Sequence, residues 1–260
     1  MQYSTEEVRV RDVGIHLRKK GKGEPVLFLH GAGGVLDWLP FFDQLAAEHA
    51  LLVPDHPGFG SSDDPQWIRS IPDVAMFYLD LIEQLDLSGI HLVGHSLGGW
   101  IAAELAVRNS TRIKSLTLIS PAGIRIPDVP VGDNFLWTQE EHARNLFHSQ
   151  AFAEKMLARV ANEEELEIQV KNRYSFAKLA WQPRLFNPDL EKWLHRVRMP
   201  ARVIWGEEDR ILPAAYADLW AEKLPQASAM RIPECGHLPQ IEQQERVAED
   251  IKKFLKEVSA

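Results

Sequence analysis

The chain has 260 residues, of which 45% are hydrophobic and 25% are charged, enough to build one large domain or two small ones. Its net charge of -8, with no basic block, argues against nucleic acid and anionic membranes as partners. The single cysteine, Cys235, excludes an internal disulfide and a cysteine-rich metal site. The first residues lack the basic start and apolar run of a secretion signal, and no apolar stretch is long enough to span a membrane. We therefore expect a cytoplasmic protein that acts on a small molecule, of unknown oligomeric state.

Strand-length apolar runs alternate along the chain with helix-length amphipathic stretches. This alternation is typical of a mostly parallel sheet with helices on both faces. The predicted strands are 8–11, 15–19, 26–29, 51–54, 90–93, 115–119, 202–205 and 229–232. Because the first two are polar on one side and joined by a short turn, we expect an antiparallel hairpin at one edge of the sheet. Helices are predicted over 74–85, 97–107 and 216–224, and apolar spacing from Val247 to Val258 predicts a last helix.

One long segment breaks the alternation, because residues 121–198 contain no convincing strand. Thr138 followed by Glu141 is a capping box, and Asn162 followed by three glutamates is a second helix start. So long an interruption between consecutive strands is usually functional. We expect 121–198 to be a helical lid, inserted after the sixth strand of a core domain formed by 1–120 and 199–260.

The motif Gly94-His95-Ser96-Leu97-Gly98 follows the strand 90–93 and opens the helix 97–107. A G-x-S-x-G between strand and helix predicts a nucleophile elbow, in which the serine stands at the tip of a sharp turn. The flanking glycines are needed because side chains there would collide. The alternative is an ordinary loop whose serine caps the helix.

A serine nucleophile needs a base within reach and a group that orients the base. Asp209 follows the strand 202–205 and His237 follows the strand 229–232, so both lie at the carboxyl edge of the sheet, where ligands of such sheets bind. The order Ser96, Asp209, His237 is the order expected with a nucleophile elbow. Glu207, Glu208 and Asp128 are the alternative acids.

The other histidines are weaker candidates for the base. We interpret His95, next to Ser96, as diverging from it. The remaining histidines that we assign to solvated or helix-surface positions are His16, His49, His142, His148 and His195.

An oxyanion hole requires two backbone donors near the nucleophile. One is expected from the Leu97 amide, and the other from the glycine-rich stretch after the strand 26–29, with Ala32 first and Gly33 second. His30 is expected to pin this stretch. A phosphate-binding loop is the alternative, but neither a Gly-Lys-Ser/Thr ending nor a G-x-G-x-x-G is present.

Several motifs together resemble the α/β-hydrolase superfamily along nearly the whole chain: His30-Gly31, residues 55–62 (DHPGFGSS), residues 94–99 (GHSLGG), residues 205–209 (WGEED) and Gly236-His237. The resemblance implies an α/β fold with an eight-stranded sheet, no cofactor and no metal. It also implies Ser96, Asp209 and His237 as nucleophile, acid and base, and a structural role for residues 55–62.

Differences between this sequence and particular members of that superfamily restrict the type of reaction that we predict. Dehalogenases and epoxide hydrolases resemble the chain elsewhere but have aspartate where this sequence has Ser96. Carbon-carbon bond hydrolases of aromatic ring cleavage share the serine but usually have tryptophan after the catalytic histidine, where this chain has Leu238. The sequence around His237 looks more like carboxylesterases and enol-lactone hydrolases. We therefore predict hydrolysis of an ester or lactone through an acyl-enzyme.

Other functions stay open on sequence grounds. The same residues would serve a carbon-carbon hydrolase, an acyltransferase, a lyase, a cofactor-free peroxidase or a slow-turnover ligand-binding protein. Apolar residues in segments that reach toward a pocket under the lid predict an apolar or aromatic substrate, although core packing would explain each of them equally well. These residues are Leu36, Trp38, Trp100, Phe135, Trp137, Trp181 and Leu238.

Overall fold

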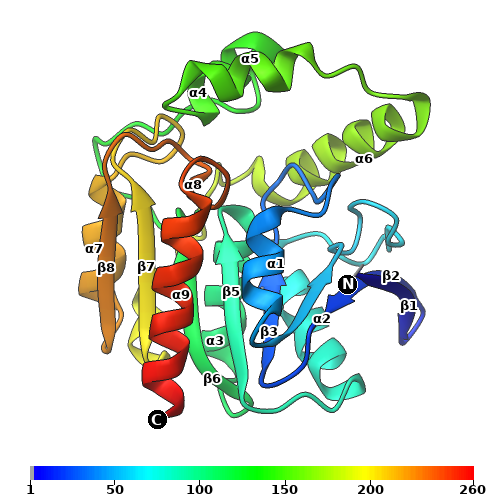
Figure 1. Cartoon of the computed structure of the whole chain (residues 1–260), viewed down its shortest axis with the longest axis vertical. Coiled ribbons are helices and arrows are strands. Elements are labelled where there is room, and N and C mark those ends of the chain that lie inside the picture. The colour runs from blue at the N-terminus through cyan, green and yellow to red at the C-terminus, as the bar shows by residue number, and fades with distance from the viewer. Residues whose placement is uncertain (1–2) are drawn as a thin grey trace.

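A computed structural model describes residues 3–260, which form one eight-stranded sheet (Figure 1). The strand order is β1-β2-β4-β3-β5-β6-β7-β8. The strands are β1 (Ser4–Val10), β2 (Val13–Lys20), β3 (Pro25–Leu29), β4 (Ala50–Pro54), β5 (Ile90–His95), β6 (Ile113–Ile119), β7 (Ala201–Gly206) and β8 (Ala227–Ile232). The predicted mostly parallel α/β sheet is confirmed.

The predicted edge hairpin is also present. β1 pairs antiparallel with β2, and β2 pairs antiparallel with β4, whereas the pairs from β4 through β8 are parallel. The parallel strands β3, β5 and β6 are almost entirely buried, as expected of strands covered on both faces.

Helices cover both faces of the sheet (Figure 1). On one face lie α1 (Pro40–Ala46) and α9 (Gln244–Ser259), and on the other lie α2 (Ile71–Gln84), α3 (Leu97–Arg108) and α7 (Ala215–Lys223). The short helix α8 (Pro239–Glu242) directly precedes α9 and packs against it. The helix predicted over 74–85 begins earlier because the Ser70 side chain accepts a hydrogen bond from the Asp73 amide and caps it. The short helices α1 and α8 were not predicted.

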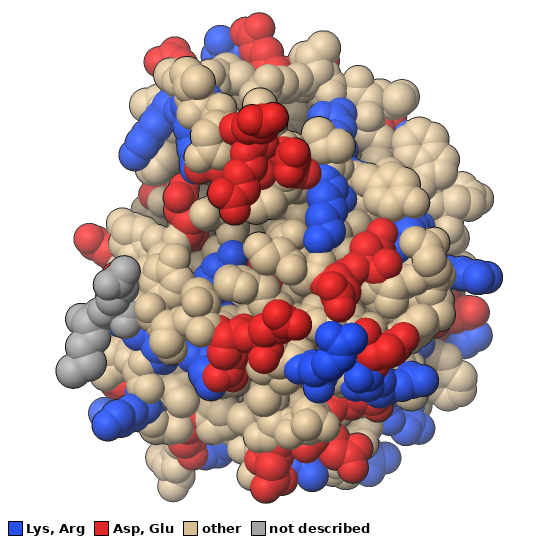
Figure 2. Space-filling model, turned by 90° about the vertical axis from the view of Figure 1, so that its right-hand side faces the viewer, with Lys and Arg blue, Asp and Glu red and all other residues tan. Residues whose placement is uncertain are grey.

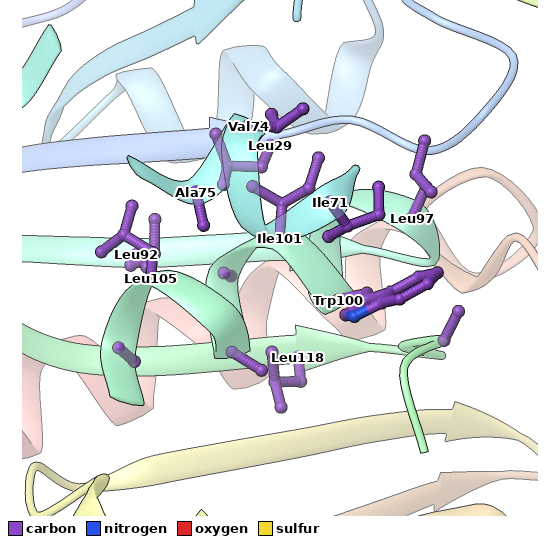
Figure 3. Packing of buried hydrophobic residues seen from close by; sticks show 14 of the residues in the cluster. Leu29, Ile71, Val74, Ala75, Leu92, Leu97, Trp100, Ile101, Leu105 and Leu118 are labelled. Carbon is purple, nitrogen blue, oxygen red and sulfur yellow. The ribbon is translucent and has the colours of Figure 1, made fainter. Parts of the chain in front are cut away.

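The core between the sheet and α2 and α3 supports the elbow. Figure 3 shows leucines of three central strands facing apolar residues of these two helices. The labelled strand residues are Leu29, Leu92 and Leu118, and those of the helices are Ile71, Val74, Ala75, Leu97, Trp100, Ile101 and Leu105. Since these side chains are buried, burial of apolar surface holds β5 and α3 at a fixed distance on either side of Ser96.

Between β6 and β7 the chain forms α4 (Gln139–Leu146), α5 (Gln150–Ala158), α6 (Glu163–Ala180) and the 3-10 helix η1 (Glu191–Arg196). Both predicted helix starts are capping boxes, at Thr138 and Asn162. Figure 1 shows α4, α5 and α6 beyond the carboxyl ends of the parallel strands. η1 instead packs against α3 and α7, two of the helices that cover one face of the sheet.

Acidic and basic side chains are interspersed on the face shown in Figure 2, which carries no continuous basic surface. Within residues 3–260, every helix is too short or too polar to cross a bilayer.

Candidate active site

The turn at Ser96 has the geometry of a nucleophile elbow. Ser96 has φ 52° and ψ -113°, a conformation rarely adopted by residues with a side chain. A Cβ on Gly94 would lie 2.4 Å from the Gly98 carbonyl oxygen, and a Cβ on Gly98 would lie 2.1 Å from the Leu29 carbonyl oxygen. The turn therefore requires glycine at both positions.

Three side chains from separate strand ends form a hydrogen-bonded chain. The Ser96 Oγ lies 2.9 Å from His237 Nε2, and His237 Nδ1 lies 2.7 Å from Asp209 Oδ2. Asp209 and His237 are 5% and 2% exposed. Because a carboxylate only accepts, His237 Nδ1 carries the proton, which leaves Nε2 free to accept the Ser96 hydroxyl proton.

Asp209 is the acid that the fold brings to His237. Its second oxygen, Oδ1, accepts the amides of Ile211 at 2.8 Å and Leu212 at 2.9 Å, so both oxygens are used and the carboxylate is fixed. The alternative acids lie elsewhere: Glu208 accepts the Cys235 amide, and Glu207 and Asp128 are exposed.

His95 supports the site without facing Ser96. Its Nε2 donates to the His237 carbonyl oxygen at 2.9 Å, so this proton is committed to the backbone. Burial, together with the nearby His237 ring, lowers the pKa of His95 to about 3 and keeps it neutral. A Cβ on Gly31 would lie 2.7 Å from His95 Nδ1, which places the ring against the loop after β3.

Residues 30–34, here called the glycine loop, lie beside Ser96. A Cβ on Gly31 would be 3.5 Å from the Ser96 Cβ. Within residues 3–260, the amides of Leu97, Ala32 and Gly33 donate no hydrogen bond. These three candidate oxyanion donors are thus free to bind a ligand oxygen.

Two stacked histidines hold the base of the glycine loop. His30 Nδ1 donates to the Gly31 carbonyl oxygen at 2.7 Å, and its Nε2 accepts the His56 amide at 3.2 Å. His56 Nε2 donates to the His30 carbonyl oxygen at 2.9 Å. Burial lowers the pKa of His30 to about 3 and the pKa of His56 well below its usual range, so both rings are neutral.

The loop that carries His237 is attached to the chain between α4 and α5. The His237 amide donates to the Leu146 carbonyl oxygen at 2.8 Å. The Glu242 carboxylate accepts the amides of Gly236 at 2.6 Å, His148 at 3.2 Å and Ser149 at 2.8 Å. Sequence reasoning missed this link, since nothing local marks Glu242 as different from other helix glutamates.

Two of the predicted pocket residues contact each other, since the rings of Phe135 and Trp181 lie edge to face with centroids 5.1 Å apart. Trp38 stacks on Tyr3 and donates to Asp43, on the side of the sheet that α1 covers, and its role in a pocket stays a prediction. Trp181 is 44% exposed and carries the Arg184 guanidinium over its ring. Trp100 is buried in the core and donates to Glu104.

The other pocket candidates are partly buried. Phe135 stacks on Phe176 of α6. Trp137 and Leu238 pack against the main core, and Leu36 is partly exposed in the loop before α1. For these residues a role in the pocket stays a prediction.

One of the histidines assigned to the surface is buried. His49 is buried with its ring edge against His91. Burial, followed by the charges of His237 and Arg173, lowers the pKa of His142 on α4 to about 4. His142 lies on α4 and is partly exposed, in agreement with its predicted helix-surface position.

This fold and this arrangement of residues have known counterparts. The family model described as alpha/beta hydrolase fold matches residues 24–244, and the chain belongs to that family. Proteins named as lipases and meta-cleavage product hydrolases are among its matches.

Three matches illustrate the range of proteins to which this chain is similar. It is 30% identical over 241 residues to the dihydrolipoyllysine-residue acetyltransferase component of an acetoin cleaving system from Pseudomonas putida, covering 90% of this chain but 64% of that protein. It is 28% identical over 268 residues to a 2-hydroxymuconate semialdehyde hydrolase from Pseudomonas sp. (strain CF600), covering 98% and 94%. The crystal structure of a membrane phospholipase A has a TM-score of 0.81 at 25% identity, covering 99% of this chain and 87% of that one.

Proposed function

We propose that this protein is a serine hydrolase that cleaves a carboxylic ester or lactone of a small apolar or aromatic molecule. The observation that carries the proposal is the continuous hydrogen-bonded chain from Ser96 Oγ through the His237 ring to the buried Asp209 carboxylate. A serine hydroxyl is a weak nucleophile until a positioned base accepts its proton. The hydrogen bonds among these three residues provide a base, His237, and fix its tautomer.

The reaction follows from these positions in two steps. His237 Nε2 takes the Ser96 proton as Oγ attacks the carbonyl carbon, and the resulting oxyanion accepts hydrogen bonds from the free amides of Leu97 and Ala32 or Gly33. His237 then gives its proton to the leaving alcohol. A water molecule, activated by the same ring, attacks the acyl-enzyme and releases the acid.

Residues 121–198 form the proposed lid of this enzyme. Its helices α4, α5 and α6 lie beyond the strand ends that carry Ser96, Asp209 and His237. A cover at this place would exclude water from the acyl-enzyme and give the substrate pocket its shape. The substrate class is therefore expected to depend on residues from this segment.

Ester or lactone cleavage is favoured by two residues. Ser96 stands where an ester-forming nucleophile is needed for acyl transfer, and Leu238 follows His237 where ring-cleavage hydrolases usually have tryptophan. Carbon-carbon bond hydrolysis is the second candidate, because the similarity to a 2-hydroxymuconate semialdehyde hydrolase extends over 94% of that protein.

Acyl transfer to another acceptor is a third possibility, supported by the similarity to the acetyltransferase component. The chain spans less than two thirds of that protein's length, so the similarity covers only part of the relative. The same triad would serve a lyase, a cofactor-free peroxidase or a slow-turnover binding protein.

A substrate panel tests the proposal. The purified protein is first labelled with a fluorophosphonate and then assayed on p-nitrophenyl esters of rising chain length, aromatic lactones and a ring-cleavage dienoate, with and without an added alcohol acceptor. We expect Ser96-dependent labelling and turnover of esters or lactones, lost in Ser96→Ala. Labelling without ester or lactone turnover would reject the proposed substrate class, and absence of labelling would reject the serine mechanism.

A further inference from the structure

Helix α6 contacts the glycine loop through the buried side chain of Asn172. Only 2% of Asn172 is exposed. Its Nδ2 donates to the Gly33 carbonyl oxygen at 2.9 Å, and its Oδ1 accepts the Gly60 amide at 2.8 Å. Gly34 has φ +75°, and a Cβ there would lie 2.4 Å from Asn172 Nδ2, so the loop lies directly against the amide group.

The bond to Asn172 fixes one end of the glycine loop, and bonds to Gly31 fix the other. The Gly31 carbonyl oxygen accepts the Gly34 amide at 3.0 Å and His30 Nδ1 at 2.7 Å. Between these two held carbonyl groups lie the free amides of Ala32 and Gly33. Gly33 itself has open space around it, because a Cβ there would meet no atom within 4 Å.

Asn172 stands on a support that is itself fixed. Ser175 Oγ donates to the Gly58 carbonyl oxygen at 2.5 Å, and Lys171 Nζ donates to the Gly60 carbonyl oxygen at 2.9 Å. Residues 55–64 are here called the scaffold loop. The loop is held in turn by the salt bridge, at 2.7 Å, between its first residue, Asp55, and Arg18. α6 is thus hydrogen-bonded to the scaffold loop through Lys171, Asn172 and Ser175.

We propose that Asn172 is a positioning residue for the oxyanion hole, and that α6 is a fixed part of the catalytic structure while the rest of the lid covers the site. The inference rests on the proposed function, since it gives the Ala32 and Gly33 amides the role of oxyanion donors. Asn172 touches no reacting atom. It acts by holding the Gly33 carbonyl group and, through it, the direction of the adjacent amides.

The physical reason is the flexibility of the loop. Three of its five residues are glycines, which sample many backbone conformations. Donors in an oxyanion hole contribute most when they are already aimed at the developing charge. A single hydrogen bond that limits the rotation of the 33–34 peptide therefore affects the transition state more than substrate binding.

Asn172→Asp is the test variant, because it keeps an acceptor for the Gly60 amide and replaces the donor to Gly33 with an oxygen. We expect kcat on the best ester and the rate constant of fluorophosphonate labelling to fall by about 10- to 100-fold, with KM within about twofold. Binding of a trifluoromethyl ketone, which forms a tetrahedral adduct with Ser96, should weaken by the same factor as kcat. Asn172→Ala should lose at least as much, and it carries the test under the same criteria if Asn172→Asp fails to fold.

Ser175→Ala is the matched control, because it removes a buried bond from α6 to the scaffold loop and leaves the bond to Gly33. We expect labelling within about threefold of the wild-type rate. If both Asn172 variants label and turn over as fast as Ser175→Ala, or if KM rises while kcat is unchanged, Asn172 has no positioning role. An unlabelled wild-type protein would instead reject the serine mechanism itself, so the two failures are distinguishable.

Discussion

At the scale of single residues, Ser96 depends on its glycine neighbours for its conformation. Its positive φ is held because Gly98 packs directly on the Leu29 carbonyl group of β3 and Gly94 packs on Gly98. In this strained backbone conformation the Ser96 hydroxyl is directed at His237 Nε2. The same close contact brings β3, and with it the glycine loop, next to Ser96.

Gly98→Ala is expected to disrupt this contact. The new methyl group would lie 2.1 Å from the Leu29 carbonyl oxygen, which is backbone and cannot rotate away. We predict a loss of about 2 to 4 kcal/mol in the free energy of unfolding, measured by urea denaturation, together with loss of fluorophosphonate labelling. Gly33→Ala is the control, because its methyl group enters open space, and it should unfold within about 1 kcal/mol of wild type. Equal stability of Gly98→Ala and wild type would show that the elbow is not packed as described.

At the scale of elements, the proposed lid, residues 121–198, is joined to both loops that carry the candidate chemistry. α6 reaches the glycine loop through Asn172, and the junction of α4 and α5 reaches the His237 loop through Leu146 and Glu242. Ser149, whose amide Glu242 accepts, is the N-cap residue of α5. A carboxylate at this position accepts hydrogen bonds from backbone amides at a helix start and in a loop at the same time.

Glu242→Gln tests the second of these links. The amide keeps the size of the side chain but leaves one acceptor oxygen for three backbone donors. We predict a loss of about 1 to 3 kcal/mol in the free energy of unfolding and a several-fold fall in kcat.

The control for this variant is Glu245→Gln, in the first turn of the neighbouring helix α9 and exposed to solvent. It should match wild type in urea denaturation and in kcat. If Glu242→Gln also matches wild type in both measurements, the carboxylate does not hold the two segments together.

At the scale of the whole molecule, buried neutral histidines make stability depend on pH. Burial lowers the pKa of both His30 and His95 to about 3 from an ordinary value of 6.5. Below pH 6.5 these histidines bind protons in the unfolded chain but stay neutral in the folded chain. Their contribution to the free energy of unfolding is therefore fully present above pH 6.5 and is lost as the pH falls toward 3.

We predict that the free energy of unfolding falls between pH 6 and pH 4 by up to about 1.4 kcal/mol per pH unit for each such histidine. Urea denaturation over this range measures the slope. His95→Gln removes one of the titrating rings and should reduce the slope by about one proton. A slope in His95→Gln equal to that of wild type would contradict this account.

Much of the architecture was predictable because its causes are local. Strand-length apolar runs, the polar hairpin 8–19 and the capping boxes at Thr138 and Asn162 each determine structure over a few residues. The helix α1 was missed because it is short and its N-cap, Leu39, makes no side-chain capping bond.

The candidate site also has parts that were predictable from local sequence and parts that were not. Ser96, Asp209 and His237 each follow a recognisable strand, so their meeting at one edge could be predicted. The contacts of Asn172 with Gly33 and of Glu242 with His148 join positions 139 and 94 residues apart. No local pattern marks such pairs, and the stacking of Trp38 on Tyr3 likewise joins positions far apart in the sequence.

The most direct test of the account is the mass of the intact protein during turnover. The protein is mixed with a p-nitrophenyl ester, quenched in acid within one turnover and analysed by mass spectrometry with peptide mapping. The account predicts a species heavier by the acyl group, with the modification on Ser96, formed with the release of p-nitrophenol and absent in Ser96→Ala. Ester hydrolysis without any acylated Ser96, at quench times shorter than a turnover, would contradict it.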